Sequence, residues 1–382
     1  MTAWSFHPGP AIFGGSDAAA RIADVLPQDG PCLFVTDKGV MSLGLANRWI
    51  AALEDEGHRL VVFDAVEADP SETTLLAAVE AGKIAGVSKV VGFGGGSPMD
   101  VAKLAAYLIG SGDDVDDIWG VERATGQALP LALVPTTAGT GSEATPVAVI
   151  TCVGDEKRGV NARALVAAWT ALDPDLTIGK PRALTAATGI DAMVHAIEAY
   201  TSAHKKNPVS DLYAREALHL LGGNLLLACE EPDNRKARGA MLLGAHYAGI
   251  AFANAPVAGV HALAYPLGGI HHLPHGLSNA LMLRPVLEHN RAAANELYAE
   301  LAPILCPDCE DEGSQSRTAR LIEWLGELVV ASGLEPRLRD HGIARDDIPM
   351  LAREAMKQQR LLVNNPCPIE EEDAARLYEA AW

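Results

Sequence analysis

The chain has 382 residues, which is enough for two to three domains of ordinary size and for a core that folds without disulfides or metal. Hydrophobic residues make up 49% and charged residues 21%, a balance that excludes a disordered protein. Asp and Glu outnumber Lys and Arg by 49 to 30, and the resulting net charge of −19 excludes a protein that binds nucleic acid or an anionic membrane surface.

The sequence carries no sign of export or membrane insertion. Every long apolar stretch is interrupted by a charge, a glycine or a proline before about 18 residues, so no membrane span is expected. Residues 1–10 lack the basic and apolar regions of a signal peptide. The six cysteines include one CxxC pair, Cys306 and Cys309, which lacks the partners that a zinc site needs. We therefore expect a cytoplasmic protein with reduced thiols.

The first half of the chain alternates short apolar runs with helical patterns. Strands are expected at residues 31–37, 59–64, 88–94 and 129–135, and helices through 49–53 and over 71–85 and 97–109. Further β-like stretches cover residues 144–152 and 162–172. This alternation predicts βαβ units around a parallel sheet.

The second half is mostly helical in pattern, with long Ala-, Leu- and Glu-rich stretches at residues 211–227 and 233–252. The turn at residues 173–175 and Pro181 mark the boundary, because proline ends the preceding structure and opens helices well. We predict an α/β domain over residues 1–180 and an all-α domain over residues 181–382. The acidic run at residues 370–373 predicts a solvated helix start.

A glycine loop follows the strand at residues 88–94. Gly94, Gly95 and Gly96 let the backbone approach a ligand closely, and the helix that begins after them offers free N–H groups to a pyrophosphate. Ser97 and Asp100 also match a capping box around a proline at the first helical position, so the loop has a structural reading as well. The spacing is not the G-x-G-x-x-G of the common dinucleotide fingerprint.

A second polar loop, residues 135–143, follows the next strand. Its hydroxyls and backbone amides lie where α/β sheets bind ligands, although an ordinary Gly/Ser/Thr turn has the same composition. Asp37 ends the first strong strand. A carboxylate there can accept hydrogen bonds from a ribose diol and repel a 2′-phosphate, which favours NAD over NADP, or it can simply initiate a turn.

Histidines are concentrated in one short segment. Twelve occur in the chain, so the fifteen residues 261–275 would hold about half of one by chance, yet they hold His261, His271, His272 and His275. Upstream, Asp191 and His195 are four residues apart in a helical pattern and so share one face. One Asp with three His is a plausible ligand set for Fe(II) or Zn(II).

These segments together resemble the iron-containing (group III) alcohol dehydrogenases, a family with the dehydroquinate synthase-like fold. The resemblance spans nearly the whole chain and follows the family's order. It is carried by GGGSPMDVAK (94–103), PTTAGTGSE (135–143), DPDLT (173–177), TGIDAMVHAIEAY (188–200), AFANAPVAGVHALAYPLGGIHHLPHGLSNA (251–280) and a closing Asn365-Pro366.

The resemblance implies a Rossmann-like dinucleotide-binding domain followed by an all-α domain. It places the metal ligands, Fe(II) or in some members Zn(II), at Asp191, His195, His261 and His275. It also implies that the glycine loop holds the pyrophosphate of NAD. Asp37 matches the position at which an acidic residue accompanies the use of NAD. The protein is also expected to form homodimers or larger assemblies. The expected cofactor-binding residues are Asp37, Gly94, Gly95, Gly96, Ser97, Asp100, Thr136, Thr137, Thr140, Ser142 and Leu176, the last against the adenosine part.

The sequence departs from the family at one position near the nicotinamide. Many members carry a histidine four residues after the third metal ligand, and this chain has Tyr265 there. We therefore name His271 or His272 as the proton-relay candidates, and Asn254 and His272 as pocket-lining candidates. For the family's lysine near the cofactor, Lys157 and Arg158 remain open alternatives.

The expected reaction is hydride transfer between a small alcohol, or its aldehyde or ketone, and NAD(H), with the alcohol oxygen bound to a divalent metal in a cleft between the domains. A dehydroquinate synthase-like lyase needs many basic groups, and residues 251–280 offer few. A maleylacetate-reductase-type enzyme is not expected to keep the full metal set. A catalytically silent metal- or nucleotide-binding protein is the alternative outside enzymes.

Overall fold

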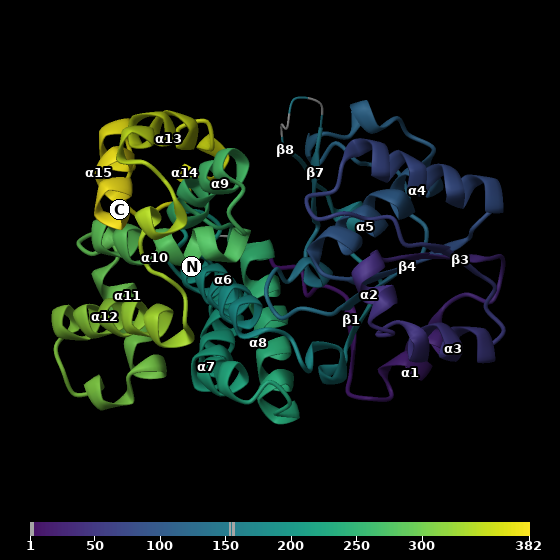
Figure 1. The fold of residues 1–382 in the computed structure, drawn as a ribbon, viewed down its shortest axis with the longest axis horizontal. Helices are drawn as coiled ribbons and strands as arrows, with labels where there is room; N and C mark the ends of the chain where they lie inside the picture. The colour runs from purple at the N-terminus through teal and green to yellow at the C-terminus, as the bar shows by residue number, and fades with distance from the viewer. Residues whose placement is uncertain (1–3, 153, 155–156) are drawn as a thin grey trace. The chain divides into compact units, whose positions relative to one another are not determined.

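The structure is a computed structural model that describes residues 4–152, 154 and 157–382. Two compact units make it up: an α/β unit of residues 8–177, drawn from purple to teal in Figure 1, and a helical unit of residues 178–382 together with residues 4–7. The division falls three residues before the boundary expected at position 180. The N-terminal residues 4–7 belong to the helical unit because the amide of Asn254 binds both the N–H and the carbonyl of His7.

A six-stranded sheet, parallel throughout, forms the centre of the α/β unit, in the order β1-β9-β6-β4-β2-β3. The strands are β1 (Ala11–Gly14), β2 (Cys32–Val35), β3 (Leu60–Phe63), β4 (Lys89–Gly94), β6 (Leu131–Pro135) and β9 (Trp169–Leu172). The helices are α1 (Ala18–Val25), α2 (Lys38–Ser42), α3 (Asn47–Asp55), α4 (Glu72–Ala85) and α5 (Gly96–Ser111). The parallel sheet confirms the predicted fold class.

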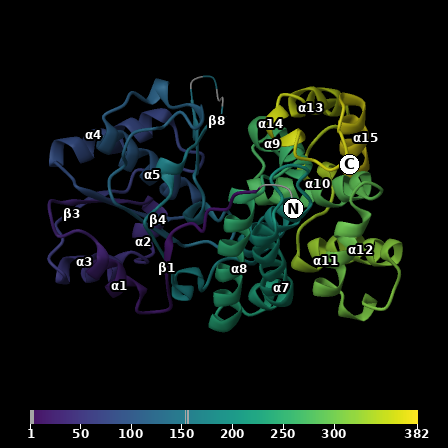
Figure 2. The same cartoon turned by 180° about the vertical axis from the view of Figure 1, so that it is seen from behind.

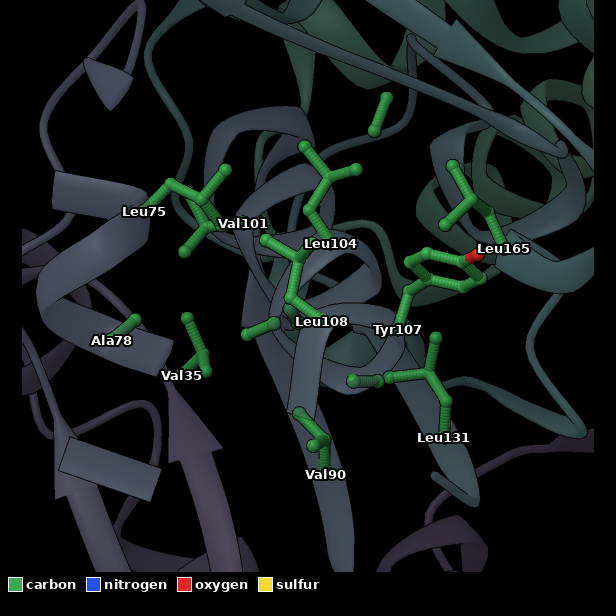
Figure 3. Close-up of a cluster of buried hydrophobic side chains, with 14 of the residues drawn as sticks. Val35, Leu75, Ala78, Val90, Val101, Leu104, Tyr107, Leu108, Leu131 and Leu165 are labelled. Atoms are coloured by element: carbon green, nitrogen blue, oxygen red, sulfur yellow. The ribbon is translucent and has the colours of Figure 1, made fainter. Parts of the chain in front are cut away.

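Alternate residues of the central strands face two separate cores, because successive side chains of a strand point to opposite faces. Val35, Val90 and Leu131 pack with α4 and α5 on one face (Figure 3), whereas Phe34 and Val91 pack with α1 and α3 on the other. Figure 2, seen from behind, shows the same two layers of helices around the sheet.

The chain reverses its direction across the sheet at β2. From β2 it passes by α3 on one face to the edge strand β3, and then returns by α4 on the opposite face to β4, on the other side of β2. The carboxyl ends of β2 and β4 therefore flank a topological switch point, which is where open α/β sheets bind ligands. This places Asp37 and the glycine loop at the expected binding edge.

A smaller sheet, β5-β8-β7, packs beside α5. It contains β5 (Gly120–Val121), β7 (Val147–Thr151) and β8 (Lys157–Asn161), with β7 and β8 antiparallel. The sequence gives no signal for β8, whose Lys, Arg, Gly and Asn are poor strand formers, or for the exposed edge strand β1. Both segments form strands because they pair with neighbouring strands in the folded protein.

The helical unit contains no strand among the described residues from 178 onward. Its helices are α6 (Arg182–Thr201), α7 (Pro208–Glu230), α8 (Arg235–Asn254), α9 (Gly259–His271), α10 (His275–Asn290), α11 (Asn295–Leu305), α12 (Ser314–Ser332), α13 (Ile348–Ala355), α14 (Gln359–Leu362) and α15 (Glu371–Ala381). Helix α6 is buried over most of its length against α7, α8 and α10. The predicted helix start at the acidic run is confirmed, since Glu370 is the N-cap residue of α15, its N–H donates to Asp373, and three acids fill the first turn.

None of the described helices is by itself long and apolar enough to cross a membrane. The pair α8 and α9, which is bent by 107°, meets the length and composition criteria only when both are taken together.

The capping box expected from Ser97 and Asp100 is wrong. Helix α5 begins at Gly96 after Gly95, without a side-chain cap, and Ser97 and Pro98 both lie inside the first turn. The carboxylate of Asp100 points elsewhere, where it accepts hydrogen bonds from Ser142 Oγ at 2.6 Å and from the N–H of Val149 at 3.0 Å. The first turn of α5 therefore keeps N–H groups that no Ser97 or Asp100 side chain covers.

Candidate metal centre and cofactor site

Helix α6 presents three chemically active side chains on one face. Asp191, His195 and Glu198 are spaced by four and three residues, so they share one side of the helix. All three are buried. A buried carboxylate or imidazole is costly unless it is paired, so this face requires partners from neighbouring helices.

Two further histidines supply those partners. His261 lies in the first turn of α9, and His275 is the first residue of α10. The Nε2 atoms of His195, His261 and His275 lie 3.9, 3.8 and 3.6 Å from Asp191 Oδ1. One ligand atom from each of the four residues lies within 4.8 Å of all the others. Bonds of about 2.0–2.2 Å to one ion would require separations of this order.

Glu198 fixes the orientation of His261. Its Oε2 atom lies 2.6 Å from His261 Nδ1, and its two oxygens accept hydrogen bonds from the N–H groups of Ala258 and Val260 at 2.9 and 2.6 Å. A proton on Nδ1 leaves the lone pair of Nε2 directed at the cluster. His261 Nε2 is buried and has no hydrogen-bond partner in the part of the chain that the structure describes, and a metal ion would satisfy it.

Neighbouring side chains hold the other ligands. Asn279 Nδ2 donates to Asp191 Oδ1 at 2.6 Å and contacts His275 Nε2 at 3.2 Å. The ring of His195 stacks on Phe252, with ring centroids 4.4 Å apart, and on His261, with centroids 4.7 Å apart. Packing against Phe252 and His261 therefore helps to fix the ring of His195.

The cluster is closed on three sides and open on one. The side chains of Asp191, His195 and His261 are 3–6% exposed, whereas that of His275 is 43% exposed. Burial opposes ionisation of Asp191, but His195, His275, His261 and the hydrogen bond from Asn279 together hold the pKa of this carboxyl below its usual range. An ionised carboxylate beside three imidazoles fits a divalent cation.

The cofactor residues of the α/β unit gather at the switch point. Asp37 caps α2 by accepting a hydrogen bond from the N–H of Val40 at 2.8 Å. A Cβ on Gly94 would lie 3.4 Å from Asp37 Oδ2, one on Gly95 would lie 3.6 Å from Thr137, and one on Gly96 would lie 3.1 Å from Thr140. The glycine loop thus lies against Asp37 and against the second polar loop at the switch point.

The comparisons with known proteins agree with this geometry. The C-terminal model of the Fe-containing alcohol dehydrogenase family matches residues 185–382, and the iron-containing alcohol dehydrogenase model matches residues 9–174. The chain belongs to the iron-containing alcohol dehydrogenase family. It is therefore an oxidoreductase, and its Asp/His cluster suits the metal for which the family is named.

Similar proteins cover nearly the whole of this family member. Long-chain-alcohol dehydrogenase 1 of Geobacillus thermodenitrificans is 37% identical over 92% of the chain and 89% of its own length. The 1,3-propanediol dehydrogenase of Citrobacter freundii is 34% identical over 92% and 91%. A crystal structure of 1,3-propanediol oxidoreductase superimposes with a TM-score of 0.95 at 32% identity and full coverage of both chains.

Two of the expected cofactor residues of this dehydrogenase are engaged inside the protein. Ser142 Oγ donates to Asp100 and accepts from Lys103 Nζ at 2.8 Å, and Lys103 also donates to Thr145 and to the carbonyl of Val147. Burial lowers the pKa of Lys103 from 10.5 to about 8, against the attraction of Asp100 and Glu143. Burial likewise raises the pKa of Asp100, although Lys103 opposes it. This network joins α5 to the second loop.

The remaining expected residues differ in their surroundings. Thr136 and Leu176 are buried, and Leu176 packs with α1 and α3. The amide of Asn254 is occupied by His7 and by the carbonyl of Ile250 at 2.9 Å, which is a structural role. Lys157 pairs with Asp69 at 2.6 Å, and Arg158 lies beside it in β8.

Within the described residues, neither proton-relay candidate forms a hydrogen bond or an ion pair with a ligand of the metal cluster. His271 is ten residues beyond His261, about 15 Å along an ideal helix axis, and lies 3.7 Å from Asp347. His272 ends α9 in a left-handed conformation with φ of 55°. Tyr265 is nearer, since its ring centroid lies 5.9 Å from that of His275.

Sequence reasoning missed Glu198, Asn279 and Lys103. A signal for Glu198 was present, because it lies three residues after His195 on the face of α6 that carries the cluster. Asn279 follows His275 by one helical turn in the same way. Lys103 offered no such signal, because its importance depends on the fold that buries it.

Proposed function

We propose that this family member transfers a hydride between NAD(H) and a small primary or secondary alcohol, or the matching aldehyde or ketone. The observation that carries the proposal is the four-ligand cluster, in which Glu198 holds His261 with Nε2 turned toward Asp191. A divalent ion, Fe(II) or Zn(II), supplies Lewis acidity toward the alcohol oxygen when it is bound there, and NAD accepts the hydride.

The protein's own groups perform the other tasks in this proposal. Asp191, His195, His261 and His275 hold the ion, and Asn279 orients Asp191. Gly94, Gly95 and Gly96 hold the pyrophosphate at the first turn of α5, with the hydroxyls of Thr137 and Thr140 across from them. Asp37 accepts from the adenosine ribose. The exposed edge of His275 is where a substrate reaches the ion.

The test compares the wild type with His261→Ala on a panel of alcohols and aldehydes, with NAD(H) and NADP(H), before and after removal of metal. We expect turnover with NAD(H) that requires metal, and a variant that binds NAD but turns over no substrate. Normal activity of His261→Ala after chelation contradicts the ligand assignment. Absence of turnover on every substrate by the metal- and NAD-loaded wild type supports a catalytically silent protein.

We also propose that the protein is cytoplasmic and forms a homodimer or a larger homo-oligomer, as the family resemblance implies. Light scattering coupled to size-exclusion chromatography measures the mass of the assembly directly. A monomer at assay concentrations contradicts the proposed assembly.

A further inference from the structure

The open side of the metal cluster leads along α9 to a tyrosine. Tyr265 is one helical turn after His261, so both side chains lie on one side of α9. Its ring is half-buried and lies 5.9 Å from the ring of His275, the exposed member of the cluster. The Tyr265 ring therefore borders the exposed member of the cluster.

A cation lies over that ring. The guanidinium carbon of Arg360, on α14, lies 5.8 Å from the Tyr265 ring centroid, and Arg360 Nη2 lies 3.5 Å from the phenol oxygen. The two ring distances place this guanidinium within about 12 Å of the His275 ring. Stacking on an aromatic ring orients a guanidinium while leaving N–H donors available to a planar oxyanion.

Arg360 is exposed, and no ion pair compensates its charge within the described part of the chain. Three other cations of the C-terminal segment each pair with a carboxylate: Lys357 with Glu354, Arg345 with Glu379 and Arg376 with Asp373. Among the described residues, none offers Arg360 a carboxylate within 4 Å. In a chain of net charge −19, an unpaired arginine beside the open side of a metal cluster is suited to an anion brought by the substrate.

We propose that Arg360 is a specificity-determining residue that selects substrates with an anionic tail. The tail is a carboxylate or sulfonate that one or two methylene groups separate from the reacting carbon, and Tyr265 holds the guanidinium that binds it. This inference rests on the proposed function, because the reacting end of the same substrate occupies the metal cluster. Arginine suits both tails, since its forked N–H groups match two oxygens of either oxyanion.

The first experiment compares kcat/KM for NADH-dependent reduction of succinate semialdehyde and sulfoacetaldehyde with that of the neutral butanal and pentanal. We expect the wild type to prefer the anionic aldehydes, and Arg360→Gln to lose about tenfold on them while keeping its rate on the neutral ones. Arg360→Lys should retain part of the preference. Arg376→Gln removes the same charge from α15 and serves as the matched control.

The second experiment needs no turnover. Metal-free protein is titrated in a calorimeter with propionate, with ethanesulfonate and with the neutral butanol. We expect the wild type to bind the two anions. Arg360→Gln should lose this binding, and Arg376→Gln should retain it. Anion binding without turnover of any aldehyde would overturn the proposed function and leave the anion site standing. The selectivity of Arg360 would be overturned if Arg360→Gln lost kcat/KM equally on neutral and anionic aldehydes. It would also be overturned if only the KM for NADH rose.

Discussion

Glu198 Oε2 lies 2.6 Å from His261 Nδ1, and the same carboxylate accepts hydrogen bonds from the N–H groups of Ala258 and Val260 at the start of α9. One buried side chain of α6 therefore orients a ligand and caps the helix that carries it. Carboxylates in this position raise the basicity of the imidazole and fix its tautomer. A negative charge at a helix N-terminus is also favoured by the helix dipole.

We therefore expect Glu198→Gln to weaken metal binding about 10- to 100-fold, because the amide is neutral and cannot accept from all three donors. Competition with a chromogenic chelator measures the affinity. Glu300→Gln is the matched control, since Glu300 accepts from the Tyr200 hydroxyl in the same unit and contacts no ligand. An unchanged affinity in Glu198→Gln means that Glu198 serves only to cap α9.

Gly276 allows the start of α10 to approach α6. A Cβ at this position would lie 2.3 Å from the carbonyl oxygen of Ala187, which neither backbone can accommodate. Gly276→Ala should therefore displace the adjacent His275, weakening metal affinity and lowering Tm. Gly269, whose added Cβ meets nothing within 4 Å, provides the control. Because it lies in a helix, Gly269→Ala should leave metal affinity unchanged and stabilise by up to about 1 kcal/mol. Equal metal affinity in both variants contradicts this account.

The sequence predicts those parts of the fold and site that are local or periodic. The strands at β2, β4 and β6 follow from buried apolar runs, and Asp191 with His195 follows from helical spacing. Strand β8 could not be predicted, because its polar sequence is a strand only when paired with β7. The prediction that Asp100 takes part in a capping box is wrong because its carboxylate accepts a hydrogen bond from Ser142, which is 42 residues away. Contacts distant in sequence leave no periodic signal.

Substitutions at Gly94 and Gly95 distinguish the role of the glycine loop in folding from its role in binding NAD. Gly94 has a φ of 153°, and its Cβ would lie 2.6 Å from Pro98. Gly94→Ala should destabilise the α/β unit by about 1–3 kcal/mol. Gly95 has a φ of −77° and room for a Cβ 3.6 Å from Thr137. Gly95→Ala should keep the wild-type Tm and raise Kd for NAD, as fluorescence titration can measure. Wild-type NAD affinity in Gly95→Ala would mean that the pyrophosphate lies elsewhere.

Asp37 both caps α2 and stands where a 2′-phosphate would be repelled. Asp37→Asn keeps an oxygen that accepts from the Val40 N–H but removes the charge. Its Tm should be unchanged, and its ratio of kcat/KM for NADP over NAD should rise about tenfold, which is about 1.4 kcal/mol. Asp37→Ala also loses the cap and should be less stable by about 1 kcal/mol. If Asp37→Asn keeps the wild-type cofactor ratio, Asp37 only initiates the helix.

Lys103 makes the free energy of unfolding depend on pH in the alkaline range. Its pKa is about 8 in the folded protein and 10.5 at its ordinary value, mainly because burial disfavours the charged amine. Between these two pKa values the Lys103 side chain is protonated in the unfolded chain but not in the folded protein. The free energy of unfolding therefore rises with pH in this range. Well below pH 8 both states are protonated, and Lys103 contributes no pH dependence. Lys103→Met lacks the titrating group, so the wild type should gain stability relative to the variant from pH 8 to 10. Urea unfolding of both proteins across this range measures the difference, in which the titration of tyrosines and cysteines cancels. A constant difference would mean that Lys103 stays protonated within its network with Asp100 and Ser142.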